Sequence, residues 1–331
     1  MDPNSRLLMM GTGGGAIVNP VGDYFSTDLY AGDQTAKTIN NGLNMLDGGL
    51  IWIKERSSGQ QHFIVDSSRG YGRVWHNGWP NSYDQNVYAG SITATTTGFS
   101  LSADPVYGNA CAANSSGNVV AWCWRKVPRF FDVVQWTGNG VSGRAISHNL
   151  QVQPALVIIR RKMTSGGDTA YAYHVNNFTG QAWDFGSATD SITTGINVST
   201  STFTVYGTTD GTGGQEGHNN VNGYDYIAYL FANDTASDGV IRGGLATGGT
   251  SVNLGWAPQW VMLRSKQANR SWEIYDTARG LATGINSDKS LTTLGNGETT
   301  VNAIEPLSNG FSLPSSYWAS ENIMYLAVRA E

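Results

Sequence analysis

The sequence predicts an all-β protein of three tandem β-sandwich-like repeats of about 100 residues each, preceded by a short N-terminal arm. An apolar run that ends in basic residues occurs at residues 50–56, 154–162 and 258–266, with the copies about 105 residues apart. Glycine is abundant at 42 residues and charged residues are scarce at 14%, which suits short strands joined by turns. No helical periodicity extends beyond about two turns.

The repeats are expected to cover residues 25–127, 128–234 and 239–331. Each contains an opening segment, a central strand, its hairpin partner, a later strand and a closing strand. In the first repeat these are residues 30–33, 50–54, 62–66, 97–101 and 119–124. In the second they are 133–140, 156–159, 171–175, 202–205 and 226–231. In the third the opening consists of 239–241 and 245–249, followed by 260–263, 271–276, 309–313 and 323–328. The first closing segment is apolar on both faces, which predicts a strand in the centre of the core.

Residues 1–24 are expected to form an arm that tethers the protein or anchors it on a neighbouring subunit. Its glycines at positions 11 and 13–15 do not indicate a nucleotide-binding loop, because no strand precedes them and Pro20 stops any helix after them. No apolar run suffices for an export signal or a membrane span, so we expect a soluble protein. The net charge of -5 and the lack of long basic runs argue against nucleic-acid binding.

The sequence contains two cysteines, Cys111 and Cys123. A bridge between them is sterically feasible, but Cys123 lies in an apolar segment, where a buried free thiol is the favoured interpretation. Stability must therefore come mainly from packing.

Catalytic and metal-binding patterns are not found, so we expect no enzyme activity and no cofactor. The sequence has no nucleophile elbow and no zinc-binding motif, and its carboxylates do not recur in a way that marks a cleft. His62 and His174 fall near the same strand of two repeats, which favours packing over catalysis. Residues 208–220 offer oxygen ligands for Ca²⁺ but lack the spacing of a dedicated loop, so a surface loop is favoured.

Two D-x-x-R-G segments carry Asp66 with Arg69 and Asp276 with Arg279. A recognition site is one interpretation, but Asp accepts backbone N–H groups in tight turns and Arg can pair with it. A feature that recurs with the repeat is more simply a structural corner. The second repeat has Asn177 in place of the arginine.

The basic residues at the ends of the central strands are Lys54, Arg56, Arg160 and Arg264. We expect them to form the solvated end of each strand, because charged side chains are rarely buried. Trp75, Trp183 and Ile285 share one register in the three repeats, so a core role is expected for all three.

Aromatic residues that the repeat does not explain are the candidates for ligand binding. Trp79, Tyr83 and Tyr88 lie in a segment rich in Asn, Asp and Gln, a composition typical of glycan sites. Tyr317 and Trp318 form a smaller candidate of the same kind. Loop packing and subunit contact are the alternatives for these residues.

The repeat resembles a family of uncharacterised structural domains of tailed bacteriophages, which often occur in tail fibres and other virion proteins. The resemblance covers residues 25–331 and implies a fold but no catalytic residues. The segments that carry it are L-I-W-I-K-E-R from Leu50, F-I-V-D-S-S-R-G from Phe63, G-F-S-L from Gly98, V-V-A-W-C-W-R-K from Val119, W-T-G-N-G from Trp136 and Q-P-A-L-V-I-I-R-R from Gln153.

From this resemblance we expect a non-enzymatic virion protein, assembled in the host cytoplasm, that acts as a tail fibre or receptor-binding component. The expected partners are other virion proteins through the arm, further copies in a homotrimer, and a host surface glycan. Neither nucleic-acid binding nor membrane insertion is expected. The alternatives are a capsid decoration protein and a tail-associated glycan-degrading enzyme.

Overall fold

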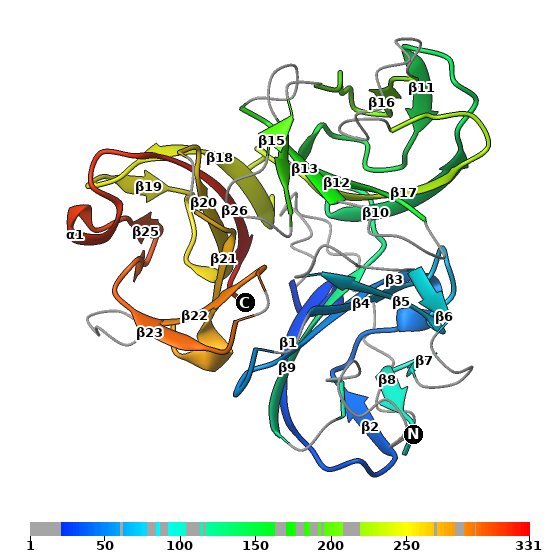
Figure 1. The fold of residues 1–331 in the computed structure, drawn as a ribbon. Helices are drawn as coiled ribbons and strands as arrows, with labels where there is room; N and C mark the ends of the chain where they lie inside the picture. The colour runs from blue at the N-terminus through cyan, green and yellow to red at the C-terminus, as the bar shows by residue number, and fades with distance from the viewer. Residues whose placement is uncertain are drawn as a thin grey trace, which may run out of the picture.

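The computed structural model shows a protein built almost entirely of β-strands, so the predicted all-β class is confirmed. Three lobes surround a common centre (Figure 1). The structure describes residues 21–59, 62–77, 84–86, 92–103, 113–114, 117–162, 170–176, 182–185, 191–192, 195–207, 219–267, 270–281, 288–294 and 296–331.

The first unit, strands β1 to β9, has a six-stranded antiparallel sheet with the strand order β1-β9-β3-β4-β5-β6 and a small sheet with the order β2-β8-β7. The strands are β1 (Phe25–Gly32), β2 (Lys37–Asn40), β3 (Gly49–Glu55), β4 (His62–Asp66), β5 (Arg73–Asn77), β6 (Asp84–Asn86), β7 (Ile92–Thr95), β8 (Gly98–Leu101) and β9 (Gly117–Arg125). Two 3-10 helices, η1 (Val21–Asp23) and η2 (Met45–Asp47), precede β1 and β3.

The second unit, strands β10 to β17, has a large sheet with the order β10-β17-β12-β13-β14-β15 and a small one that pairs β11 with β16. Its strands are β10 (Phe131–Thr137), β11 (Arg144–Ser147), β12 (Pro154–Arg161), β13 (Ala170–His174), β14 (Ala182–Asp184), β15 (Ser191–Ile192), β16 (Thr202–Val205) and β17 (Asp225–Ala232).

The third unit, strands β18 to β26, has a large sheet with the order β18-β26-β20-β21-β22-β23 and a small sheet with the order β19-β25-β24. Its strands are β18 (Ile241–Thr247), β19 (Ser251–Asn253), β20 (Pro258–Ser265), β21 (Glu273–Asp276), β22 (Asp288–Thr292), β23 (Thr299–Val301), β24 (Glu305–Leu307), β25 (Gly310–Ser312) and β26 (Asn322–Arg329), with η3 (Thr277–Arg279) and the helix α1 (Ser315–Trp318).

The large sheets of the three units have the same strand order along the chain, since the opening strand pairs with the closing strand, which pairs with the central strand. Opposite residues show the same register: β4 places Ile64 beside Trp75, and β13 places Ala172 beside Trp183. In the third unit Ile274 lies beside Leu291, because the connection between these strands is longer there. Leu291 therefore takes the place that sequence spacing assigned to Ile285, which lies outside the described residues.

Each central strand is buried on both faces, and the two faces serve different cores. In β3, Ile51 and Ile53 pack against the small sheet of their own unit. Leu50 and Trp52, on the other face, join a cluster drawn from all three units. A strand covered on both sides needs apolar residues at every position, which explains the continuous apolar runs in the sequence.

The shared centre is rich in aromatic rings that cross unit boundaries. The Trp124 ring of the first unit lies 5.0 Å from Trp260 of the third and 4.9 Å from Phe231 of the second, measured between centroids. Trp75 stacks on Tyr229 of the second unit at 6.0 Å. All five side chains are buried, and truncating such a residue to alanine costs about 3–5 kcal/mol. The three units thus form one body with a common core.

The two D-x-x-R-G segments form structural corners, as predicted. Asp66 accepts the backbone N–H of Arg69 at 2.9 Å and its Nε at 2.5 Å, and Arg69 also donates to a carbonyl of β4. Asp276 accepts the same two groups of Arg279 at 2.9 and 2.7 Å. His174 occupies the equivalent position of the second unit. It lies opposite Leu156 of the central strand, as Asp66 lies opposite Leu50 and Asp276 lies opposite Trp260.

Each corner also contacts a closing strand of another unit. The first unit reaches the second, the second reaches the third and the third reaches the first, so the contacts form a closed ring. Between the first and second units, the Tyr229 hydroxyl donates to Asp66 at 2.9 Å. Between the second and third, the His174 imidazole bonds the Tyr325 carbonyl at 3.0 Å. Between the third and first, the Trp122 indole N–H donates to Asp276 at 2.9 Å.

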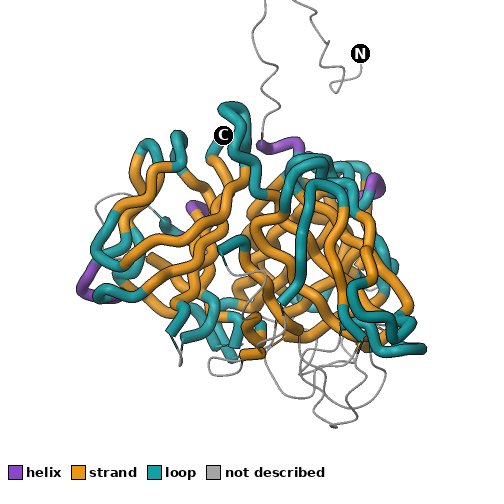
Figure 2. The backbone as a smooth tube through the Cα atoms, turned by 90° about the horizontal axis from the view of Figure 1, so that it is seen from above, coloured by secondary structure: helices purple, strands orange, loops and turns teal. Residues whose placement is uncertain are grey.

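The molecule has two distinct ends along the direction of the central strands. Figure 2 shows η1 and the C-terminus at the same end, which we call the proximal end. The backbone of Gly22 lies against Glu331 there, since an added Cβ would meet its carboxylate at 2.0 Å. The central strands run away from this end, so that β12 and β20 finish at Arg161 and Ser265 at the opposite, distal end.

Candidate functional site

The predicted ligand-binding residues fall in two places. Trp79, Tyr83 and Tyr88 lie outside the described residues, so their prediction is untested. Tyr317 and Trp318 belong to α1, which precedes the closing strand of the third unit at the distal end.

Trp318 is fully buried, and its indole N–H donates to the Ala303 carbonyl at 2.5 Å. Its ring therefore packs in the outer core of the third unit and offers no free face to a ligand in this conformation. Tyr317 is half-buried, and its hydroxyl donates to the carboxylate of Glu273 at 3.0 and 3.1 Å. Only part of the Tyr317 ring is left for contact with another molecule.

Glu273 is the buried acid at the base of this cluster. It lies in β21 and also accepts the hydroxyl of Tyr275, so two tyrosines share one carboxylate. Burial raises its pKa, while the two hydroxyl donors and Arg270 act in the opposite direction. Burial next to this acid also raises the pKa of both tyrosines. The hydroxyls therefore stay protonated and act as donors.

Arg270 completes the cluster. Its guanidinium lies 5.0 Å from the Tyr317 ring and 5.1 Å from the Trp318 ring, and it donates to the Tyr317 carbonyl at 3.0 Å and to Glu321 at 3.3 Å. Cation–π contacts of this kind and the ion pair hold α1 against the sheet. Glu273 and Arg270 were not predicted from the sequence, because neither is close in sequence to the aromatic pair.

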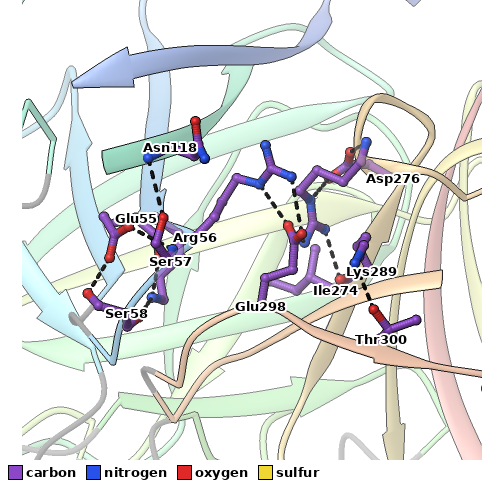
Figure 3. Close-up of polar contacts among 12 residues, drawn as sticks. Glu55, Arg56, Ser57, Ser58, Asn118, Ile274, Asp276, Lys289, Glu298 and Thr300 are labelled. Carbon is purple, nitrogen blue, oxygen red and sulfur yellow. Dashed lines mark hydrogen bonds and ion pairs between the residues drawn. The ribbon is translucent and has the colours of Figure 1, made fainter. Parts of the chain in front are cut away.

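A group of charged side chains joins the first and third units (Figure 3). Arg56, just beyond β3, donates to Glu298 through Nε at 2.7 Å and Nη2 at 3.1 Å. The Glu298 backbone N–H returns a bond to the Arg56 carbonyl at 2.7 Å, and Arg279 approaches the same carboxylate at 3.8 Å. A bidentate pair with a backbone bond fixes both position and orientation.

The expectation that the basic strand ends are solvated is wrong. Lys54, Arg160 and Arg264 are each at most 2% exposed, and Arg56 is occupied by Glu298. Burial lowers the pKa of Lys54 to about 8, and its ammonium donates to the Glu55 and Ser58 carbonyls at 2.5 and 3.1 Å. These cations lie where one unit meets another, which a single strand pattern does not reveal.

Arg160 illustrates the role of these buried cations. Its guanidinium lies over the ring of Trp75 in the first unit, 4.9 Å from the centroid. Arg264 of the third unit is influenced by Asp184 of the second, although burial is the larger effect and lowers its pKa to about 10. Arg160 thus contacts a second unit directly, and we assign it to the joining of units.

His62 and His174 have packing roles, as predicted. Nδ1 of His62 accepts the Trp52 indole N–H at 2.7 Å, so its Nε2 carries the proton and donates to the Thr292 carbonyl of the third unit at 2.8 Å. Burial, together with nearby Lys54, lowers the pKa of His62 to about 3. His174 is likewise buried, which lowers its pKa to about 4.

Metal-binding geometry does not emerge in the part of the chain that the structure describes, where no group of three His, Cys, Asp or Glu side chains converges. Residues 208–218 of the segment considered for Ca²⁺ lie outside that part. Asn219 and Asn220, at its end, are buried and bond to neighbouring loops instead.

Cys123 is a buried free thiol, and burial raises its pKa well above the usual range. No helix of the described residues is long and apolar enough to cross a membrane.

The described residues define an all-β protein of three similarly ordered units, in which buried charges and aromatic rings join one unit to the next. The chain belongs to a family described as a domain of unknown function, DUF7483, whose model matches residues 20–129 and 129–327. The first match spans the first unit, and the second spans the other two. A search of curated proteins found no match.

Proposed function

We propose that the chain is a non-enzymatic structural protein of a tailed-bacteriophage virion, acting as a tail fibre or receptor-binding component that contacts host surface glycans. In this proposal the N-terminal arm attaches the protein to other virion proteins. The protein is assembled in the host cytoplasm and then becomes part of the particle.

The observation that carries the proposal is the opposition of the two ends. The described end of the arm, η1 at Val21–Asp23, and the C-terminal residue lie together at the proximal end, while residues 1–20 of the arm lie outside the described residues. The distal end carries other loops between strands, among them the segment with the Tyr317 cluster. Attachment at one end leaves the loops of the other end free to meet a surface, and loops on a rigid scaffold are where binding residues are usually found.

The use of charge supports a structural role. At the junction of the first and third units, Lys54, Arg56 and Arg279 are matched by Glu55, Asp276 and Glu298, and several of these side chains are buried. Charges matched in this way orient the units. The resemblance of the repeat segments to phage structural domains points in the same direction.

Immunogold labelling of particles with an antibody against this protein, viewed in negative stain, tests the proposal directly. Label on the tail or its fibres is the expected result. Label on the head would favour the capsid decoration protein, and the absence of label from every particle would refute the virion assignment. Release of reducing sugars from host polysaccharide by the purified protein would favour the glycan-degrading enzyme.

The proposed self-association is tested separately. A homotrimer predicts a mass in light scattering three times that of the 35.5 kDa chain. A mass equal to that of one chain would refute the homotrimer and show that the protein is a monomer in solution.

A further inference from the structure

A pocket of about 440 Å³ lies at the proximal end of the third unit. It is lined by the connection between the second and third units at residues 236–237, by Arg242 of the opening strand β18, and by residues 253–256 just before the central strand β20. The backbone N–H of Ala330 donates to the Ala257 carbonyl at 2.7 Å, so the C-terminal segment passes beside this last stretch. The volume is in the range of pockets that hold a ligand.

The charge of Arg242 is not matched by an acid among the described residues. Its Nη1 donates to the Leu254 carbonyl at 3.2 Å, and no described carboxylate forms an ion pair with it. The acids of the adjoining connection, Asp234 and Asp238, are instead held by Arg129 at 2.8 and 2.6 Å. An arginine keeps its charge at any physiological pH, so Arg242 is available to an anion from outside the chain.

The lining offers donors and an apolar wall. The Nε of Arg242 and the indole N–H of Trp256 have no acceptor among the described residues. Both atoms are shielded from solvent, so the remaining terminal nitrogen of Arg242, Nη2, is the donor that a ligand meets first. The buried side chains of Leu254 and Trp256 give the pocket apolar surface beside these donors. Such a lining suits a ligand that has acceptor oxygens at the end of a short apolar stem.

The same place in the second unit is satisfied within the chain. Asp132 is the second residue of its opening strand, as Arg242 is in the third unit, and it forms an ion pair with Lys126 at 2.9 Å. Val152 takes the place of Trp256, counted back from the proline that begins each central strand. The repeat therefore explains the backbone at this place, but not the unmatched arginine or the tryptophan of the third unit.

We infer that this pocket binds an acidic side chain of the virion protein to which the proximal end is attached. A carboxylate accepts two N–H groups from one guanidinium and supplies the missing negative charge. The methylene groups of a glutamate can pack on Leu254 and Trp256 while its carboxylate meets Arg242. The inference rests on the proposed function, which makes the proximal end the attached one, and it adds a second contact to that of the N-terminal arm.

The test uses two peptides that differ only in charge, acetyl-Ala-Leu-Glu-Leu-Ala-amide and the same peptide with glutamine in place of glutamate. Each is titrated into the full chain labelled with ¹⁵N, and NMR follows the indole N–H signal of Trp256, which is assigned by its loss in Trp256→Phe. We expect the glutamate peptide to shift this signal until it saturates. The glutamine peptide should bind about tenfold more weakly, because it cannot form the charge-assisted hydrogen bonds.

The variant Arg242→Gln should weaken binding of the glutamate peptide by about the same factor and remove the difference between the two peptides. Arg144→Gln is the matched control, because Arg144 is also half-buried and donates to a carbonyl, that of Thr137 at the distal end of β10. Circular dichroism and thermal unfolding show whether each variant is folded. The comparison of the two peptides on the unmodified protein needs no variant.

Equal binding of the two peptides overturns the inference, and so does a Trp256 signal that neither peptide shifts. Undiminished binding of the glutamate peptide by folded Arg242→Gln has the same meaning. If Arg144→Gln weakens binding as much as Arg242→Gln does, the peptide is attracted by overall charge and the pocket is not its site. Immunogold labelling decides the virion assignment separately, so that assignment can stand when the pocket fails.

Discussion

Acid should loosen the third unit from its neighbours. It is held to the first unit by His62 on the Thr292 carbonyl and to the second by His174 on the Tyr325 carbonyl. In both rings Nδ1 accepts an N–H group, so a second proton has no acceptor and would face a donor. The folded protein therefore resists protonation of both histidines.

The sign and size of the effect follow from the pKa values. Folding lowers the pKa of His62 to about 3 and that of His174 to about 4, from about 6.5 in the unfolded chain. The unfolded state thus binds more protons below pH 6.5, and the stability present above that pH is lost as the pH falls through the two folded values. At pH 4.5 each histidine is expected to reduce the free energy of unfolding by about 3 kcal/mol relative to pH 7.5.

Urea unfolding followed by tryptophan fluorescence at pH 7.5 and 4.5 measures this loss. The comparison is with the double variant carrying His62→Gln and His174→Gln, because glutamine keeps a donor and an acceptor but does not titrate. Groups common to both proteins cancel in the difference, including Asp288, whose pKa is raised to about 6 by burial. If the double variant loses as much stability on acidification as the unmodified protein, the assignment of the two histidines is refuted.

Three further predictions concern single side chains. Glu298→Gln should lower the free energy of unfolding by about 1–3 kcal/mol, because it leaves partly buried arginines without their carboxylate. The control Lys289→Gln, at a half-buried lysine whose ammonium bonds only the Thr300 hydroxyl among the described residues, should change it by less than about 0.5 kcal/mol. Trp122→Phe should be more destabilising than Trp124→Phe by about 1–2 kcal/mol in urea unfolding, because the Trp122 indole bonds a buried carboxylate and the Trp124 indole has no such bond in the described structure; equal losses would contradict this. In a variant whose other cysteine is replaced by serine, Cys123 should react with a thiol reagent only after the protein is unfolded. If Cys123 of the folded variant reacts as fast as an exposed cysteine, its thiol is not buried as described.

The fold could be predicted because local signals agree with the final structure. Apolar runs at residues 50–54 and 119–124 become the paired strands β3 and β9, covered on both faces. The D-x-x-R-G corner is also a local structure, since Asp66 bonds the third residue after it. Such features need no knowledge of distant parts of the chain.

The environment of the charged residues could not be predicted in the same way. Lys54 and Arg160 come at the end of apolar runs, a pattern typical of a strand that runs out to solvent, yet both are buried, and Arg160 lies over the Trp75 ring of the first unit. The partner of Arg56 is Glu298, 242 residues further along the chain. In the third unit Leu291 lies opposite Ile274, because the connection between β21 and β22 is longer than in the other units. The error in each case lies in tertiary contacts that sequence spacing does not encode.

The closed ring of contacts between the units has a consequence for how the protein responds to dilution. A ring of three separate chains dissociates as its concentration falls, because its stability depends on protomer concentration. Here the segments 126–130 and 233–240 connect the units covalently, so each unit meets its neighbours at a high effective concentration set by short connections. The contacts of the ring therefore do not depend on protein concentration. They are lost only when a unit unfolds or separates from the other two units of the same chain.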